Sequence, residues 1–218
     1  MATLDDIRSR VTRIVQDSVY TDEIVDAFIN EGLQRCAGLV LLPDLMSTGV
    51  VATAIDAYSV PIPTTWNFDR NLYLCSTVVD KRRLEVFSSV ALLSGQYPEF
   101  NLAIDDREVL ACTATRTQFI YYPVPTAITS LQCAFYQKPT LLTVDTAEPS
   151  ILPEFLHYDL LVNFACFKVF SEIEDGIDGV QVNTTKYFKL FDAAITELSV
   201  YFRTGQSRPA PSRRSDWV

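Results

Sequence analysis

The chain has 218 residues, of which 48% are hydrophobic, and a formal net charge of −9 at neutral pH. This length and composition are enough for one large buried core or two small ones. The charge argues against a protein that wraps nucleic acid, because such binding relies on clustered Lys and Arg that release counterions from phosphates. The longest apolar runs, such as residues 39–42, are far shorter than the roughly 20 residues of a membrane span. We therefore expect a soluble protein with no membrane partner.

Acidic residues at the N-terminus stand where a secretory signal would be basic and then apolar, so we do not expect export by that route. The cysteines are dispersed and contain no CxxC pair, which argues against a metal site and a disulfide framework. We expect buried, reduced thiols that act as small hydrophobes in a protein folded in a reducing cytoplasm. These cysteines are Cys36, Cys75, Cys112, Cys133 and Cys166.

Two helices are predicted at the N-terminal end. Residues 3–17 place apolar side chains on one face, and Thr3 followed by Asp6 has the spacing of a capping box. A second helix is predicted from an N-cap at Thr21 until Pro43, with acidic residues in its first turn. The two helices should form a hairpin.

The pattern changes between about residues 48 and 139, where short runs rich in Val, Ile, Thr, Tyr and Phe are separated by turn residues. The runs show partial alternation of apolar and polar residues, and several prolines fall at their ends, where a missing amide donor does least harm. The runs are VVATAIDAYSVPIP, NLYLCSTVV, RRLEVFSSV, EVLACTAT, TQFIYYPVP and SLQCAFYQ. This section predicts a small, mostly antiparallel sheet.

Helical patterns return after the sheet. An unusually apolar helix is predicted to open near Pro153 and to end around residues 172–179, and a last helix is predicted at about 180–203. The apolar faces of the four helices can be buried only if the first pair packs on the last. We therefore expect an α+β protein: a four-helix bundle (residues 1–45 and 150–204) with a β-rich, mostly antiparallel insertion (46–149) between the second and third helices.

Residues 205–218 contain two prolines, three arginines and no periodicity, which predicts an extended C-terminal arm without a core of its own. A basic arm on an acidic protein is typical of a docking segment, although a merely disordered terminus has the same composition. A large aromatic is costly to leave in water and is favoured as an interface anchor, so Trp217 favours docking. The candidate docking residues are Arg208, Arg213, Arg214 and Trp217.

Few residues are candidates for catalysis or for binding a cofactor or a metal. No phosphate-binding, dinucleotide-binding, nucleophile-elbow or zinc-protease motif is present, so no catalytic residue, cofactor or metal site is predicted. His157 fits a capping or packing residue better than a catalytic one. The acidic stretch 171–179 lacks the ligand pattern of a calcium loop and fits a solvated turn. Residues 105–108 and the basic stretch 80–83 fit polar connections between strands.

The stretch AFYQKPTLLTVDTAEPSILPEFLHYDLLVNFA, residues 134–165, resembles a segment of the head-to-tail adaptor (connector) proteins of tailed bacteriophages. In that family a strand ending in tyrosine, lysine and proline leads through a polar loop to a leucine-proline pair that opens the next helix. The matching residues here are Tyr136, Lys138, Pro139, Leu152, Pro153, Phe155, His157, Leu160, Leu161 and Ala165. The order of the other segments is similar as well, although Gln137 interrupts the tyrosine-lysine spacing.

The resemblance implies a structural virion protein in the phage neck, folded in the host cytoplasm. Such a protein forms a ring, commonly a dodecamer, beneath the portal protein, extends the DNA channel and provides a platform for a tail or nozzle protein. Its C-terminal arm reaches the portal, and DNA passes without sequence-specific binding. A net-negative lumen suits that passage, because DNA would not adhere to it.

Two other functions stay open on the sequence alone. A tail-completion or tail-tube terminator protein would use similar segments without touching the portal. An enzyme, such as a cysteine hydrolase that uses Cys166 and His157, is the second alternative. Those two residues are nine positions apart, or about 13 Å along a helix axis, which is too far for proton transfer.

Overall fold

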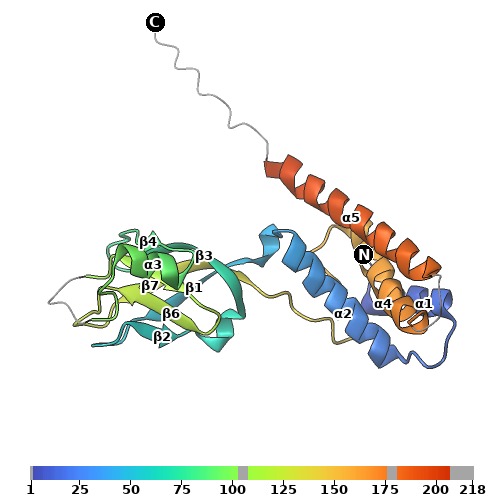
Figure 1. The fold of residues 1–218 in the computed structure, drawn as a ribbon, viewed down its shortest axis with the longest axis horizontal. Helices are drawn as coiled ribbons and strands as arrows, with labels where there is room; N and C mark the ends of the chain where they lie inside the picture. Colours follow the sequence, from blue (N-terminus) through green and yellow to red (C-terminus); the bar gives the residue numbers. More distant parts are fainter. Residues whose placement is uncertain (1, 103–107, 176–180, 207–218) are drawn as a thin grey trace, which may run out of the picture. The chain divides into compact units, whose positions relative to one another are not determined.

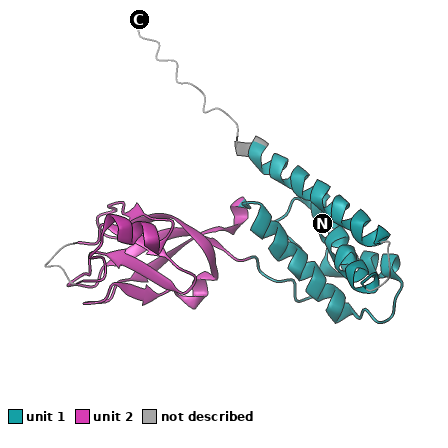
Figure 2. Cartoon of the chain, in the orientation of Figure 1, with its two compact units in different colours: residues 1–42, 139–218 teal, residues 43–138 magenta. Residues whose placement is uncertain are grey.

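The structure is a computed structural model that describes residues 2–102, 108–175 and 181–206. The chain divides into two compact units (Figure 2): unit 1 consists of residues 1–42 and 139–218, and unit 2 of residues 43–138. Unit 1 is helical and unit 2 is mostly β (Figure 1), so the predicted α+β class is confirmed.

The first two helices of unit 1 begin where the sequence predicts. Helix α1 (Leu4–Val15) opens with a capping box in which the Thr3 hydroxyl accepts the Asp6 amide and the Asp6 carboxylate accepts the Thr3 amide. Helix α2 (Asp22–Leu39) follows Thr21, although the side chain of that residue makes no capping hydrogen bond. The capping box is therefore confirmed, and the second helix starts at the predicted residue without a side-chain cap.

The predicted continuous helix from Pro153 is wrong in its first part. Pro153 has an extended backbone (φ −60°, ψ 134°), so it precedes the helical segment instead of entering it. A 3₁₀ turn (Glu154–Leu156) and a π turn (Tyr158–Val162) come first, and regular helix begins only with α4 (Asn163–Ile173). Helix α5 (Val182–Gln206) then closes unit 1 at about the predicted position.

Aromatic side chains hold α4 against α5. Phe164 packs edge-on against Phe191 with ring centroids 5.1 Å apart, and Phe170 stacks on Tyr187 at 5.4 Å. Helix α2 also packs on α4, and α1 packs on both. The buried apolar faces of these helices form the core of unit 1, which includes Ile7, Val11, Ile29, Leu33, Cys36, Ala165, Cys166, Val169 and Leu198.

The described residues of unit 2 form two sheets, where the sequence predicted one. Sheet A has the strand order β1-β7-β3 and sheet B the order β2-β6-β5-β4. All pairs are antiparallel except β4 with β5. The strands are β1 (Met46–Ala52), β2 (Ser59–Pro61), β3 (Phe68–Thr77), β4 (Glu85–Val86), β5 (Ala111–Ala114), β6 (Gln118–Tyr122) and β7 (Ser130–Gln137).

Apolar residues from both sheets meet in a shared core. Trp66 stacks on Phe135 with ring centroids 4.5 Å apart, and Phe119 and Tyr121 of sheet B are fully buried in the same cluster. Each sheet has one apolar inner face, and packing the two faces together removes both from water. This requirement explains why the strands form two sheets.

A short helix, α3 (Val90–Gln96), lies where the sequence predicted the end of a strand. Ser89 caps it by accepting the Leu92 amide. Leu93 is buried against sheet B, and Tyr97, which follows the helix, stacks on Tyr122 of β6 at 4.3 Å. The helix therefore covers the face of sheet B that points away from sheet A.

The chain enters and leaves unit 2 through neighbouring strands. Strand β1 is the first strand and β7 the last, and they pair along their whole length from Met46 opposite Tyr136 to Ala52 opposite Ser130. Backbone and side-chain hydrogen bonds between Asn67 and Lys138 fix the end of β7. The two connections to unit 1 thus start side by side.

Candidate interaction surfaces

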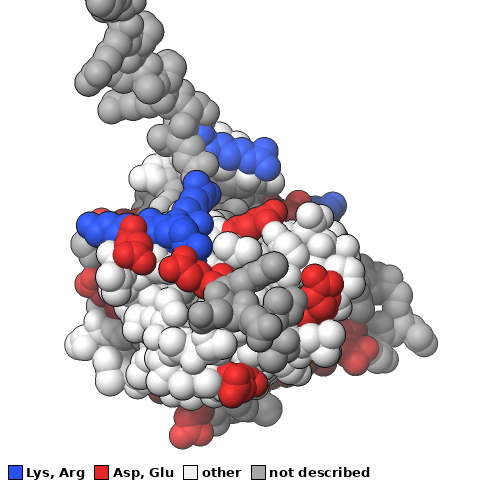
Figure 3. All heavy atoms as spheres, turned by 90° about the vertical axis from the view of Figure 1, so that its left-hand side faces the viewer, with Lys and Arg blue, Asp and Glu red and all other residues white. Residues whose placement is uncertain are grey.

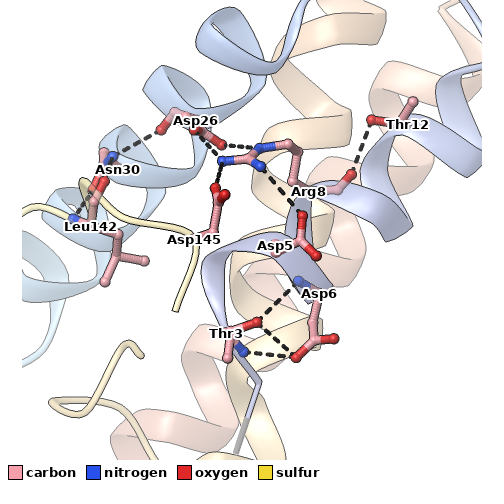
Figure 4. A network of polar contacts seen from close by, with 9 residues as sticks. All are labelled: Thr3, Asp5, Asp6, Arg8, Thr12, Asp26, Asn30, Leu142 and Asp145. Carbon is pink, nitrogen blue, oxygen red and sulfur yellow. Dashed lines mark hydrogen bonds and ion pairs between the residues drawn. The ribbon is translucent and has the colours of Figure 1, made fainter. Parts of the chain in front are cut away.

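A polar network fixes the segment that returns to unit 1 after β7 (Figure 4). The guanidinium of Arg8 donates two hydrogen bonds to Asp26, from Nε at 2.8 Å and Nη2 at 2.7 Å, and a third to Asp145 at 2.9 Å. The Arg8 side chain is only 12% exposed, and the carboxylates of Asp26 and Asp145 raise its pKa. Paired hydrogen bonds of this kind between Arg and a carboxylate are strong and directional.

Asn30 of α2 holds the same segment by a second contact. Its side-chain oxygen accepts the Leu142 amide at 2.7 Å, and its side-chain nitrogen donates to the Leu142 carbonyl at 2.9 Å. The backbone amide of Leu4 also donates to the Ala147 carbonyl at 2.8 Å. The segment after β7 therefore covers this side of α1 and α2, so this side is not open to a partner.

The connection between α4 and α5 is closed by a carboxylate. Glu174 accepts the backbone amides of Asn183 and Thr184, both at 3.0 Å, and the Thr184 hydroxyl at 2.7 Å. Burial raises the pKa of Glu174, but the hydrogen bonds from Thr184 and Asn183 outweigh that effect, so the pKa lies below its ordinary value. The sequence predicted a solvated turn in this acidic stretch. Glu174 within it caps the first turn of α5.

An apolar patch lies where the end of α2 meets the last described turns of α5. A shallow hollow there is lined by Leu39, Val40, Leu41, Ser199, Phe202 and Arg203. Leu39 and Leu41 are 50% and 53% exposed, and the neighbouring Val200 and Tyr201 are about half exposed. Grouped exposed apolar side chains mark interaction sites more often than scattered ones do. We call these residues the α2–α5 patch and regard it as the candidate surface of unit 1.

The outer face of sheet A is the candidate surface of unit 2. Side chains alternate along β1, so Val51 points into the core while Met46 and Val50, which are 45% and 54% exposed, point away from sheet B. Leu74 of β3 is 39% exposed on the same side, since it pairs with Ala134, which also pairs with Thr48. Strand β1 is an edge strand without charge or proline, and such edges are open to pairing with another chain.

Charged side chains occupy only part of the surface of unit 2. Figure 3, which draws the whole chain, shows basic side chains near the top of the view with acidic ones beside them, while much of the described face is uncharged. In the basic stretch 80–83, Arg82 pairs with Glu108 at 2.9 Å and donates to the Val109 carbonyl at 2.8 Å. Its backbone also pairs with Thr77 across the turn. This stretch is a hairpin connection, as predicted.

The two residues of the hydrolase alternative are both buried. His157 is 1% exposed, its Nε2 lies 3.0 Å from the Leu152 carbonyl, and its Nδ1 has no partner among the described residues. Burial raises the pKa of Cys166 to about 12, so at neutral pH the group is a thiol and not the nucleophilic thiolate. This arrangement suits packing residues.

Other predicted features fall partly outside the described residues. The docking residues Arg208, Arg213, Arg214 and Trp217 lie outside them, as do Asp105 to Arg107 and residues 176–180. Within the described part of the chain, no group of three or more His, Cys, Asp or Glu side chains could hold a metal ion. None of the described helices combines the length and apolarity that crossing a membrane requires.

Comparison with known proteins places this geometry in context. A family model described as "SU10 adaptor protein" matches residues 2–215, which include both units and most of the C-terminal segment. No curated protein is significantly similar to the chain.

Proposed function

The chain belongs to the SU10 adaptor protein family of phage head-to-tail adaptors, and from this premise we propose that it is a structural virion protein of the phage neck. In this proposal, copies of the chain form a ring, commonly a dodecamer, beneath the portal protein. The ring extends the DNA channel and provides a platform for a tail or nozzle protein. The observation that carries the proposal is the family match over residues 2–215, because it includes both compact units and most of the C-terminal arm.

The surfaces of the two units support assembly rather than catalysis. A ring needs head-to-tail contacts between two different surfaces of neighbouring copies. The α2–α5 patch and the outer face of sheet A are two such surfaces, both apolar and on different units. In this proposal the helices of unit 1 act as the four-helix bundle that forms the body of the ring.

The charge of the chain supports a role beside DNA. With a net charge of −9, the ring would present an acidic lumen that repels phosphates, so DNA would pass without sequence-specific binding. A filter-binding measurement with duplex DNA at low salt tests this part. Tight binding at low salt would contradict it.

We assign portal docking to Arg208, Arg213, Arg214 and Trp217. The arginines would pair with acidic groups of the portal, and Trp217 would supply a large apolar anchor. Segments that order on binding lose conformational entropy, and attachment through many copies in a ring compensates for that loss.

The test is the mass of the purified chain with and without the portal protein of its phage, measured by native mass spectrometry and electron microscopy. We expect a ring seated on the portal. Deletion of residues 207–218, which leaves α5 complete, should leave the melting temperature unchanged and weaken portal binding about tenfold or more, as loss of an interface anchor does.

Two matched variants separate the contribution of Trp217 to portal binding from that of the arginines. Trp217→Ala should weaken portal binding at every salt concentration, whereas the pair Arg213→Ala and Arg214→Ala should weaken it mainly at low salt. Unchanged binding after the deletion would refute the assignment of docking to the arm. A ring that binds tail tubes and ignores the portal would refute the adaptor function in favour of a tail-completion or terminator protein.

A further inference from the structure

Three of the five cysteines lie together in the core of unit 2. Cys75 comes from β3, Cys133 from β7 and Cys112 from β5, so both sheets contribute. The sulfurs of Cys75 and Cys133 are 3.2 Å apart, and all three residues are at most 1% exposed. All five cysteines are free and buried, as the sequence predicted, but these three are dispersed only in the sequence.

The backbone places Cys75 and Cys133 in position to bond. They are direct partners in the β3–β7 ladder, and the irregularities of β3 end before Leu74, so the pairing is regular from there to Thr77. The Cβ atoms of directly opposed residues are about 4.5–5.5 Å apart, close to the 3.5–4.5 Å of disulfides. A disulfide bond measures about 2.05 Å, so the two sulfurs need to approach by only about 1.2 Å.

Hydrogen bonding within the cluster makes the three thiols unequal. Cys112 and Cys133 both hydrogen-bond to Cys75, which lowers the pKa of Cys75 and raises the pKa of each partner. The thiolate is the reactive form of cysteine, so Cys75 is the sulfur of the cluster that an oxidant attacks first. Cys36 and Cys166 of unit 1 differ, because burial raises the pKa of each to about 12.

Opening one edge of sheet A is enough to reach Cys75. Strand β3 is an edge strand of sheet A, so its separation from β7 breaks a single ladder of that sheet, while residues 75–77 can stay paired with residues 82–84 on the other side. Local openings of this kind occur in native proteins without global unfolding. A small oxidant therefore has a route to a sulfur that is buried in the closed state.

We propose that Cys75 and Cys133 form an oxidation site, in which a small peroxide converts the two thiols into a disulfide across β3 and β7. The Cys75 thiol first loses its proton, and hydrogen peroxide then transfers one oxygen to the thiolate, giving a sulfenic acid and a hydroxide that takes up that proton to become water. The Cys133 sulfur then attacks the Cys75 sulfur, and the sulfenic oxygen leaves as a second water. In total, two thiols and one peroxide give one disulfide and two waters. This site is independent of the proposed adaptor function.

The test uses the full-length variant Cys36→Ala/Cys166→Ala, which retains only the cluster. The folded protein is treated with hydrogen peroxide, denatured, alkylated with iodoacetamide and weighed intact. We expect three alkylated thiols before oxidation and one after it, with the uncapped mass lower by about 2 Da for the two hydrogens lost. Peptide mapping without reductant should identify the Cys75–Cys133 pair, and the disulfide should raise the melting temperature of unit 2 by about 10 °C.

If the double variant does not fold, wild-type protein serves for the same measurement. It should also lose two thiols, from five before oxidation to three after it. Cys75→Ala should abolish the loss of thiols, whereas Cys112→Ala should preserve it. Retention of all thiols at a peroxide dose that oxidises a folded dithiol protein would overturn the proposal. So would a map that shows Cys75 joined to Cys112, or oxidation of Cys75 to sulfinic acid without a disulfide.

Discussion

Units 1 and 2 differ in the number of stretches of the sequence that form them. Unit 2 is one continuous stretch, residues 43–138, and its core contains stacked aromatics such as Trp66 and Phe135. Unit 1 is assembled from two stretches, and polar contacts between positions more than a hundred residues apart fix the second to the first, as in Leu4 with Ala147 and Asn30 with Leu142. The continuous unit thus combines local connections with apolar packing, whereas the divided unit also needs directional contacts to set where its second part docks.

This difference predicts that a substitution that destabilises one unit leaves the stability of the other unit unchanged. Hydrogen exchange measured by mass spectrometry reports the two units separately, because each supplies its own peptides. Four substitutions test the comparison, and each should change protection in one unit alone.

The largest effect is expected for Trp66→Ala in unit 2. Trp66 is 6% exposed and stacks on Phe135, so its removal leaves a cavity between the sheets. We expect a loss of about 3–5 kcal/mol in the free energy of unfolding of unit 2, seen as faster exchange in β3, β6 and β7. Trp217→Ala is the matched control and should leave exchange unchanged. Equal loss of protection in unit 1 would show that the two units unfold together.

Gly49→Ala should destabilise unit 2 by about 2 kcal/mol. A Cβ at this position of β1 would overlap the indole of Trp66, whose Nε1 and Cε2 are the nearest atoms, so the ring must move away from Phe135. Gly38→Ala in α2 is the control, since a Cβ there meets open space. That change should stabilise unit 1 by about 0.5–1 kcal/mol through helix propensity. Urea unfolding of both variants checks the opposite signs, and a neutral Gly49→Ala would contradict the close packing of Trp66.

Arg8→Ala should destabilise unit 1 by about 1.5 kcal/mol, mostly through loss of the two hydrogen bonds to Asp26. The Asp145 side chain is 71% exposed, so its pairing with Arg8 should contribute little. Arg8→Lys keeps the charge but cannot donate two parallel hydrogen bonds, and it should restore only part of the loss. Thermal unfolding measures the series. Full restoration by Lys would show that charge alone matters.

The smallest effect is expected for Glu174→Gln, and it should depend on pH. The folded pKa of Glu174 lies below its ordinary value of 4.5, so the ionised cap stabilises unit 1 fully above about pH 4.5 and is lost as pH falls through the folded pKa. Wild type should therefore melt higher than the variant at pH 7, and the difference should shrink as the pH falls below 4.5. A difference that persists at low pH would mean that the carboxylate is not the stabilising form.

Local features were predictable from the sequence. The capping box of Thr3 and Asp6 is set by residues three positions apart, and the predicted strand SLQCAFYQ matches β7, residues 130–137. Helix α3 was missed, although Ser89 offered a capping signal, because its seven residues are too few to show a helical period. The turns after Pro153 were missed because an apolar run is compatible with 3₁₀, π and α-helical backbone alike.

The polar and thiol clusters could not be predicted, because they join residues that only the fold brings together. Cys75 and Cys133 are 58 positions apart, and Asn30 and Leu142 are 112 apart. No periodicity in the sequence encodes either pairing. The docking assignment to the C-terminal arm rests on composition and on the family resemblance, and it stays a prediction.

The pairing of β1 with β7 has a consequence for how this architecture can vary. Because Met46 lies opposite Tyr136, the strands by which the chain enters and leaves unit 2 are separated there by only about 5 Å, the width of one ladder step. A domain whose ends nearly touch can be lengthened, shortened or exchanged without moving the residues that flank it. Unit 2 is in this sense a domain that another domain with adjacent ends can replace. A short turn joining Leu42 to Pro139 should leave a chain of helices that folds alone, and a foreign domain with adjacent termini should be tolerated in its place.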